Sequence, residues 1–419
     1  QAVDIDGVPT AFFSSFGRIS YAGKPHEAYK SFDEAYKALP DGGELVFNGS
    51  AAFAYDTIGT GARFSLRGIG KTATASAVTV EAETLSAAAD LELHDLSFVL
   101  PENNRIVLNG HDFTAENFDA FFTIPDYQTG ARRYSPFPNV YSGDASENYT
   151  ITVSGGHYGT VASAGKVNAD AVLSFDGSEI DTLVIGAFSG DTVGNVELTL
   201  YNTTVENLII GAKDGTMKGN VTVKAEKSII GNIAVGAYGE KSTFAGTVGI
   251  YTDETTIKKL SDGGDGKAEC GVVYFISDGA APTAIDEKAR YDQMLCLSGG
   301  KGEPITDENG NLTGVACYDT FGVAAKTLRL ADGTELKPEN GIFKLEKGTY
   351  IAEIRSGLDL RVRDDAQYVS GYTDGTFRPT GNMTRAEAMT LLTRIIADYD
   401  AVQNGKFESA YTDLAPDAW

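Results

Sequence analysis

Basic residues and long apolar runs are scarce in this chain of 419 residues. The 34 Lys and Arg face 58 Asp and Glu, which gives a formal net charge of −24 at pH 7. Because proteins that bind nucleic acids carry a basic footprint, this balance argues against nucleic-acid partners. No apolar run approaches ~18 residues, so no membrane-spanning segment is expected.

Cysteine is also scarce. Cys270, Cys296 and Cys317 have neither the spacing of a metal site nor the even number of a disulfide framework. We expect buried or inert thiols, with room for one optional bridge, and we expect no cofactor and no metal. The opening residues, "QAVDIDGVPT", have no charged or apolar region of a signal peptide. Either the protein is cytosolic, or a signal was removed before this numbering begins.

Glycine and aromatic residues, by contrast, are plentiful. The chain has 48 Gly, 20 Tyr and a single Trp, which favours a β-rich protein with many turns. One short helix is predicted at 31–39, "SFDEAYKAL", where Ser31 and Glu34 form a capping box. A Gly turn and a strand follow it. This order predicts an N-terminal cap, at about 25–43, on a long β region.

An internal repeat dominates the region from about 44 to 255. The segments "TLVIGAFSGDTVGNVELTL", "NLIIGAKDGTMKGNVTVKA" and "NIAVGAYGEKSTFAGTVGI" start at Thr182, Asn207 and Asn232, so the period is 25 residues. A unit of this length, built from short strands, is about one coil of a parallel β-helix. A β-propeller is the alternative, but its blades need roughly 40–45 residues.

The repeat predicts which side chains stack between coils. Leu183 and Ile185 are expected to lie on the equivalent residues of the next two copies, Leu208 and Ile210, then Ile233 and Val235. Each copy has a Gly after this strand, at Gly186, Gly211 and Gly236. A glycine there permits a bend with positive φ between two faces of the coil.

These patterns predict a mainly β protein in three parts. A right-handed parallel β-helix with an N-terminal capping helix is expected at 1–285, interrupted by a protruding loop at 125–148. A small β module is expected at 286–360, where "ENGN" and "ADGT" are hairpin turn signals. The composition changes again near 364, so the third part is placed at 361–419.

The third part contains a signature at 371–387, "GYTDGTFRPTGNMTRAE". Thr384 is the expected helix N-cap, with Glu387 completing a capping box. Apolar residues then recur at helical spacing. The signature resembles the S-layer homology domain, a module that holds bacterial surface proteins on the wall. The ending "YTDLAPDAW" resembles the start of a second such module, so the third part is read as a truncated, partly helical module of this kind.

The resemblance implies a partner and a place. The family binds secondary cell-wall polymers, often through a pyruvate ketal on a sugar, and the arginine of its Thr-Arg-Ala-Glu motif meets that carboxylate. By position this arginine is Arg385, whose charge opposes the helix dipole unless an anion binds there. Thr384, Arg378 and Trp419 are further candidate polymer contacts. The implied protein is secreted and extracellular, on the bacterial wall, with its signal peptide removed.

The function of the β-helix is left open between two classes. It can be displayed for structural, adhesive or carbohydrate-binding use, or it can be a polysaccharide lyase or glycoside hydrolase. Only one acidic pair, Asp181 and Glu206, aligns at the 25-residue period, and no catalytic residue is assigned. Three or more ionisable side chains converging from neighbouring coils would favour an enzyme. Scattered Thr, Ser, Asn and Lys would favour display.

Two sets of residues complete the search for sites. The aromatic and basic side chains of the protruding loop form a possible glycan-contact surface for another polysaccharide; they are Tyr127, Arg132, Arg133, Tyr134 and Phe137. The four histidines share no spacing, and each is expected to be an ordinary residue; they are His26, His94, His111 and His157.

Overall fold

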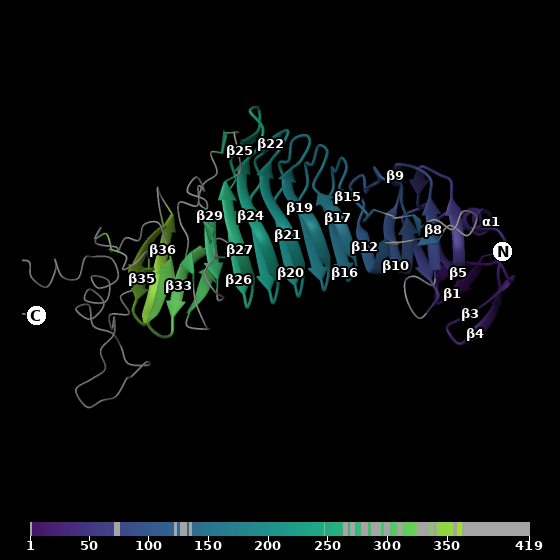
Figure 1. The fold of residues 1–419 in the computed structure, drawn as a ribbon, viewed down its shortest axis with the longest axis horizontal. Helices are drawn as coiled ribbons and strands as arrows, with labels where there is room; N and C mark the ends of the chain where they lie inside the picture. The colour runs from purple at the N-terminus through teal and green to yellow at the C-terminus, as the bar shows by residue number, and fades with distance from the viewer. Residues whose placement is uncertain are drawn as a thin grey trace, which may run out of the picture. The chain divides into compact units, whose positions relative to one another are not determined.

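In the computed structural model, β-strands stack side by side in consecutive coils (Figure 1). The structure describes residues 2–70, 76–120, 124–125, 132–133, 136–246, 248–262, 267–268, 273–277, 284–285, 295–296, 302–307, 312–324, 335, 337, 342–354 and 358–362. The chain divides into two units, Gln1–Val362 and Arg363–Trp419, and all described residues belong to the first.

Two long sheets form the walls of the coils. The first sheet has the strand order β1 (Val3–Ile5), β2 (Val8–Ser14), β5 (Gly43–Phe53), β7 (Arg63–Gly68), β10 (Asp90–Val99), β12 (Phe113–Ala120), β16 (Tyr149–Ser154), β18 (Ala171–Asp176), β20 (Val196–Tyr201), β23 (Val221–Glu226), β26 (Val248–Asp253), β29 (Val273–Ser277) and β31 (Leu295–Cys296), with β8 (Ser76–Val80) beside β5 and β10. The second sheet has the order β6 (Thr57–Ile58), β9 (Thr84–Ala87), β11 (Arg105–Val107), β15 (Val140–Tyr141), β17 (His157–Ala162), β19 (Glu179–Ala187), β21 (Thr204–Ala212), β24 (Ile229–Ala237), β27 (Thr256–Asp262) and β30 (Ala284–Ile285). Apart from the β1–β2 pair, their strand pairings are parallel. The mainly β fold and the parallel β-solenoid are therefore confirmed.

The core lies between the two sheets and is built by stacking like residues. Along β18, β20 and β23, the residues Leu173, Leu198 and Val223 are direct partners, and each is at most 1% exposed. Their neighbours Ser174, Thr199 and Lys224 point to the other face, because side chains alternate along a strand. The sequence alternation of apolar and polar residues thus sets which face of each coil is buried.

The predicted stacking of the three repeat copies is confirmed. Leu183 pairs with Leu208, and Leu208 with Ile233, in the parallel register of β19, β21 and β24. The glycines that follow also pair, and their φ angles are 126° at Gly186, 138° at Gly211 and 146° at Gly236. The bend therefore uses backbone conformations that L-residues rarely adopt.

The length of the coil is not constant. The 25-residue period holds from β18 to β23, where Ala171, Val196 and Val221 are partners. Earlier coils are shorter, as His157 pairs with Glu179 and Leu91 with Phe113, 22 residues on in each case. The pair Phe113–Ile151 is 38 residues apart and encloses the interruption predicted at 125–148. Within it, β13 (Ile124–Pro125) and β14 (Arg132–Arg133) pair antiparallel.

The short helix α1 (Phe32–Lys37) lies in the first coil, between β2 and β5. As predicted, Ser31 is its N-cap, and the Ser31 hydroxyl accepts a hydrogen bond from the Glu34 backbone N–H at 3.4 Å. Phe32 and Ala35 are buried and belong to the main core. The role of this helix as an end cap stays a prediction.

Further strands follow the two long sheets. A hairpin, β3 (Arg18–Tyr21) with β4 (Lys24–Glu27), precedes α1, and the strands β22 (Thr216–Met217), β25 (Thr243–Phe244) and β28 (Lys267–Ala268) form a short third parallel sheet. After the coils, β32 (Gly302–Thr306), β33 (Leu312–Cys317), β36 (Gly348–Ile354) and β37 (Leu358–Val362) form an antiparallel sheet, and β34 (Phe321–Ala324) pairs with β35 (Ile342–Leu345).

Cys317, in this antiparallel sheet, is a buried free thiol. Burial raises its pKa to about 12, which keeps the thiol protonated and unreactive near neutral pH. The expectation of an inert thiol therefore holds at this position.

A ladder of buried hydroxyls links the coils at the turn between the two sheets. Its members are Ser178, Thr203, Ser228 and Thr255. Each of the first three donates its backbone N–H to the hydroxyl of the next coil: Ser178 to Thr203 Oγ1 at 3.4 Å, Thr203 to Ser228 Oγ at 3.1 Å, and Ser228 to Thr255 Oγ1 at 3.2 Å. Thr203 Oγ1 also lies 2.8 Å from the Tyr201 carbonyl oxygen, to which it can donate.

We expect Thr203→Val to lower the free energy of unfolding by about 1–3 kcal/mol, because it leaves the buried Ser178 N–H without its acceptor. Thr204→Val, at the exposed neighbouring position, is the matched control and should change stability by at most ~0.5 kcal/mol. Urea unfolding of the two variants checks this. Equal stability of both would contradict a structural role for the ladder.

Tyr158 places a hydroxyl in the core with no hydrogen-bond partner among the described residues, and the residue is 0% exposed. Burial, with a smaller effect of Asp119, raises the Tyr158 pKa far above its usual value. An unfolded tyrosine releases its proton near pH ~10. The contribution of the neutral Tyr158 side chain to the free energy of unfolding is therefore fully present below pH ~10, and it is lost as the pH rises above that value.

Tyr158→Phe is accordingly expected to leave stability at pH 7 unchanged within ~1 kcal/mol, since no hydrogen bond is lost. Above pH ~10 the variant should lose less stability than the wild type. Denaturant unfolding at pH 7 and at alkaline pH measures both effects, with the exposed Tyr201→Phe as a control. Parallel alkaline losses in wild type and Tyr158→Phe would rule out this assignment.

Candidate functional site

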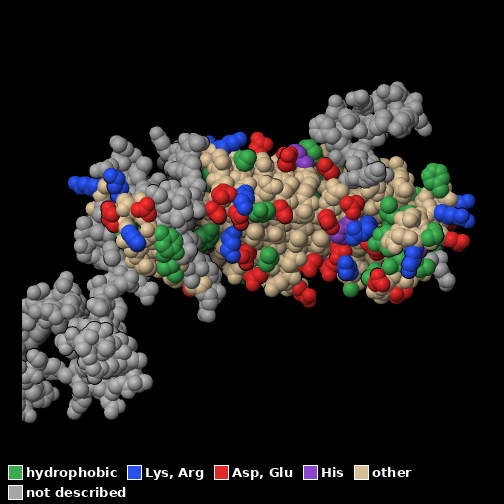
Figure 2. Space-filling view, turned by 90° about the horizontal axis from the view of Figure 1, so that it is seen from below, with side chains coloured by type: hydrophobic (Ala, Val, Ile, Leu, Met, Phe, Trp, Pro, Cys, Tyr) green, Lys and Arg blue, Asp and Glu red, His purple; other side chains and the backbone are tan. Residues whose placement is uncertain are grey.

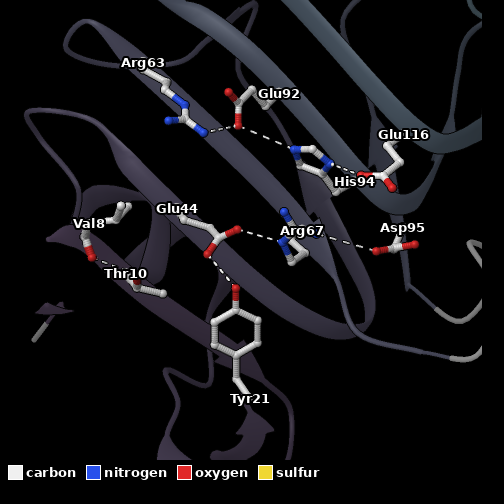
Figure 3. Close-up of polar contacts among 10 residues, drawn as sticks. All are labelled: Val8, Thr10, Tyr21, Glu44, Arg63, Arg67, Glu92, His94, Asp95 and Glu116. Carbon is white, nitrogen blue, oxygen red and sulfur yellow. Dashed lines mark hydrogen bonds and ion pairs between the residues drawn. The ribbon is translucent and has the colours of Figure 1, made fainter. Parts of the chain in front are cut away.

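Ionisable side chains gather on the outward face of β5, β7, β10 and β12. We call this group the charged patch; it consists of Glu44, Arg63, Arg67, Glu92, His94, Asp95 and Glu116 (Figure 3). The strand register brings it together, because Arg67 and Glu116 are the direct partners of His94 on its two sides. Figure 2 shows basic, acidic and histidine side chains close together on one face of the molecule.

One half of the charged patch centres on Arg67. Its Nε lies 2.7 Å from Glu44 Oε1, and one terminal nitrogen lies 3.7 Å from Asp95 Oδ2. The hairpin strand β3 adds Tyr21, whose hydroxyl donates to Glu44 Oε2 at 2.9 Å. The Glu44 side chain is 13% exposed and that of Arg67 29%. Burial and the hydrogen bond to Glu44 raise the pKa of Tyr21, so it stays a donor at neutral pH.

The other half centres on His94, whose side chain is 10% exposed. Its Nδ1 lies 3.3 Å from Glu116 Oε2 and its Nε2 lies 3.5 Å from Glu92 Oε2. Arg63 also reaches the same Glu92 oxygen, at 2.6 Å. A neutral imidazole has one N–H and can donate to one of these carboxylates, whereas an imidazolium can donate to both.

The chemistry open to this group follows from its composition. A histidine between two carboxylates can carry a proton from one to the other, which is the requirement of general acid–base catalysis. The two guanidinium groups can hold an anionic substituent through charge-assisted hydrogen bonds. Among the described residues no cluster of His, Cys, Asp or Glu has the arrangement of a metal site. The patch thus has the groups for binding an acidic ligand or for proton transfer to one.

A second histidine cluster lies on the other sheet. His157 Nδ1 is 3.2 Å from Glu179 Oε2, and its Nε2 is 2.8 Å from Asp181 Oδ1. The imidazole ring stacks on Phe137, with 3.5 Å between centroids and 8° between planes. Of the five predicted glycan-contact residues, Phe137 is the one whose side chain the structure describes, and it packs against His157 on the coil wall.

His94 and His157 each lie between two carboxylates, and His111 Nδ1 lies 3.5 Å from Asp90 Oδ1; that the four histidines are ordinary residues stays a prediction. His94 and Glu116 are 22 residues apart, as are His157 and Glu179. The 25-residue period of the later repeats does not align these pairs. A 22-residue period in the earlier coils is the sequence signal that could have found them.

The other predicted site residues are placed as follows. Arg132 and Arg133 form β14, paired with β13, and their side chains lie outside the described residues, as do Tyr127 and Tyr134. The predicted polymer contacts Arg378, Thr384, Arg385 and Trp419 lie outside the described residues too. Their contacts with glycan stay predictions.

Comparison with known proteins finds a family match for one segment of the chain. Residues 365–389 match the S-layer homology domain family, and this range includes Arg378, Thr384 and Arg385 but not Trp419. A domain of this family implies a cell-surface protein associated with the bacterial wall. The chain matches no curated protein and no solved structure. In the described part of the chain, no helix has the length and apolar character needed to cross a membrane.

Proposed function

We propose that this protein is held non-covalently on the bacterial wall by its S-layer homology segment, which binds a secondary cell-wall polymer. The β-solenoid is then the displayed part, in structural, adhesive or carbohydrate-binding use. The observation that carries the proposal is the family match at 365–389. Within it, Arg385 supplies a cation in the first turn of a predicted helix, where free N–H groups also favour an anion. A pyruvate carboxylate on the polymer fits this combination.

The outward faces of the central coils agree with display. The row of direct partners on β16, β18, β20 and β23 reads Thr152, Ser174, Thr199 and Lys224. These residues offer hydrogen bonds but no group of converging acids. Such a face suits a scaffold or an adhesive surface better than catalysis.

A sedimentation experiment tests the anchor. The full-length protein should pellet with purified walls that carry their polymer, and not with walls stripped of it. Arg385→Ala should weaken retention by ~10-fold or more, since a charge-assisted bond is worth about 1.5–3 kcal/mol. Arg394→Ala, at the other end of the same predicted helix, is the matched control. Equal retention of Arg385→Ala and Arg394→Ala would remove Arg385 from the site.

A second candidate function is supported by the charged patch. We infer a polysaccharide lyase or glycoside hydrolase as the alternative, because ionisable side chains from neighbouring coils converge there around His94. In this function Glu92, His94 and Glu116 move the proton, and Arg63 and Arg67 hold an acidic sugar.

Its test is depolymerisation of acidic polysaccharides, followed by new reducing ends and by unsaturated products. His94→Gln and Glu116→Gln should each lower the rate by ~100-fold or more. Lys224 pairs with Glu197 on coils that are distant from the charged patch. The Lys224→Gln variant should therefore keep the wild-type rate. If wild-type protein yields no product from any acidic polysaccharide, the enzymatic alternative is wrong.

A further inference from the structure

A row of aromatic and basic residues crosses the second sheet near the ends of its strands. Ala187, Ala212 and Ala237 are partners in three successive coils, so the residues that follow them occupy equivalent positions. These are Phe188, Lys213 and Tyr238. Their backbone N–H groups continue the ladder: that of Lys213 donates to the Ala187 oxygen and that of Tyr238 to the Ala212 oxygen, each at 2.8 Å.

The row extends toward the N-terminus over a coil made of small residues. Tyr141 pairs with Ala162, which pairs with Val184 of the next coil. Because Ala162, Ser163 and Ala164 fill this middle coil, the rings of Tyr141 and Phe188 approach each other across it. Their centroids are 6.0 Å apart at an interplanar angle of 45°. The two rings are partly exposed and form a continuous aromatic surface.

A cation lies over each ring. The Arg105 guanidinium carbon is 5.8 Å from the Tyr141 centroid, and Lys213 Nζ is 4.4 Å from the Phe188 centroid. Both basic residues are exposed. We call Arg105, Tyr141, Phe188 and Lys213 the aromatic–basic strip.

The two cations of the strip lie over aromatic rings and not beside carboxylates. Neither Arg105 nor Lys213 has a carboxylate within ion-pair distance among the described residues, whereas Arg63, Arg67 and Lys224 each have one within 2.7 Å. In a chain with 58 acidic residues, this leaves two positive charges available to a ligand.

Two acids of the neighbouring turns accept hydrogen bonds from the backbone. Asp144 Oδ1 accepts the Lys166 backbone N–H at 2.7 Å, and Asp191 Oδ1 accepts that of Thr216 at 2.8 Å. These bonds tie the two carboxylates to the turns of the following coils. Among the described residues no ion pair neutralises Arg105 or Lys213, whose exposed side chains lie over the two rings.

We propose that the aromatic–basic strip binds a linear, carboxylate-bearing polysaccharide laid along the solenoid axis. Sugar rings pack their apolar faces on Tyr141 and Phe188, and acidic substituents meet Arg105 and Lys213. From the coil of Arg105 to that of Lys213 there are four strand spacings of ~4.8 Å, or ~19 Å, which suits an extended chain of several sugars. This deepens the proposed function, since it gives the displayed solenoid a ligand, and it rests on that display role.

The test uses the full chain and soluble polygalacturonate, with a neutral galactan as the uncharged comparison, followed by affinity electrophoresis and calorimetry. The wild type should bind polygalacturonate more tightly than galactan. Lys213→Gln should weaken that binding ~10-fold or more and remove the preference for the acidic polymer. Phe188→Ala should weaken binding to both. Lys224→Gln should bind as the wild type does.

Folding is checked by thermal unfolding, and the exposed Lys213→Gln keeps the test valid if Phe188→Ala destabilises its coil. Absence of polygalacturonate binding by the wild type, or binding that Lys213→Gln leaves unchanged, overturns the proposal. The anchor is tested separately by wall pelleting. There, strip variants should be retained like the wild type while Arg385→Ala is not, so either idea can fail without the other.

Discussion

Leu198→Asp is expected to unfold the central coils of the β-solenoid. Leu198 is 0% exposed and lies directly between Leu173 and Val223 of the neighbouring coils. The substitution removes a buried apolar side chain, which alone costs about 2–5 kcal/mol, and places a carboxylate where no described residue offers it a charge partner. We therefore expect a loss of more than ~4 kcal/mol in the free energy of unfolding.

Thr199→Asp is the matched control for this variant. Thr199 follows Leu198 in β20 but points to the outer face, so an aspartate there stays hydrated. Its effect should stay near ~0.5 kcal/mol. Urea unfolding followed by circular dichroism measures both variants. Similar destabilisation by the two would mean that the inward and outward faces of β20 are wrongly assigned.

The position of the damage is informative as well. In a solenoid each coil contacts only its neighbours, so a defect spreads through the interfaces on either side. Amide hydrogen exchange should increase first in β18, β20 and β23 and remain slower in β10 and β12. Uniform loss of protection along the solenoid would instead mean that its coils unfold as one cooperative unit.

The fold was predictable where the sequence repeats itself. Three copies with the same 25-residue spacing specify which residues stack, and Leu183, Leu208 and Ile233 are in contact as that spacing requires. The information is local, because an apolar–polar alternation decides the buried face and a Gly marks the bend. Ser31 was likewise readable as a helix cap from its own neighbourhood.

The candidate site was less predictable, because its side chains meet through coil lengths that vary. His94 contacts Glu116, which lies 22 residues later in the sequence, while Arg63 contacts Glu92, which lies 29 residues later. No single period links these pairs, since insertions in the turns change the spacing without changing the register of the strands. Tyr21 comes from a hairpin outside the repeat, so its bond to Glu44 has no sequence pattern at all.

Gly211→Ala is expected to be the second strongly destabilising change. The backbone of Gly211 has a φ of 138°, which an alanine rarely adopts. A Cβ at this position would also lie 1.8 Å from the Gly236 carbonyl oxygen of the next coil. Because that contact is with backbone, the stacked strands β21 and β24 would have to separate to relieve it. We expect a loss of more than ~3 kcal/mol, together with local loss of strand pairing.

Gly155→Ala separates the two causes. Gly155 also has a positive φ, 73°, but a Cβ there would meet nothing within 4 Å. Its substitution therefore reports backbone strain alone, at about 1–2 kcal/mol. Thermal and urea unfolding of the two variants should show the larger loss for Gly211→Ala, because its Cβ meets the backbone of the next coil and its φ is the less accessible to alanine. If Gly155→Ala were as destabilising as Gly211→Ala, backbone conformation would account for both losses. The close stacking of Gly186, Gly211 and Gly236 would then make no separate contribution to the free energy of unfolding.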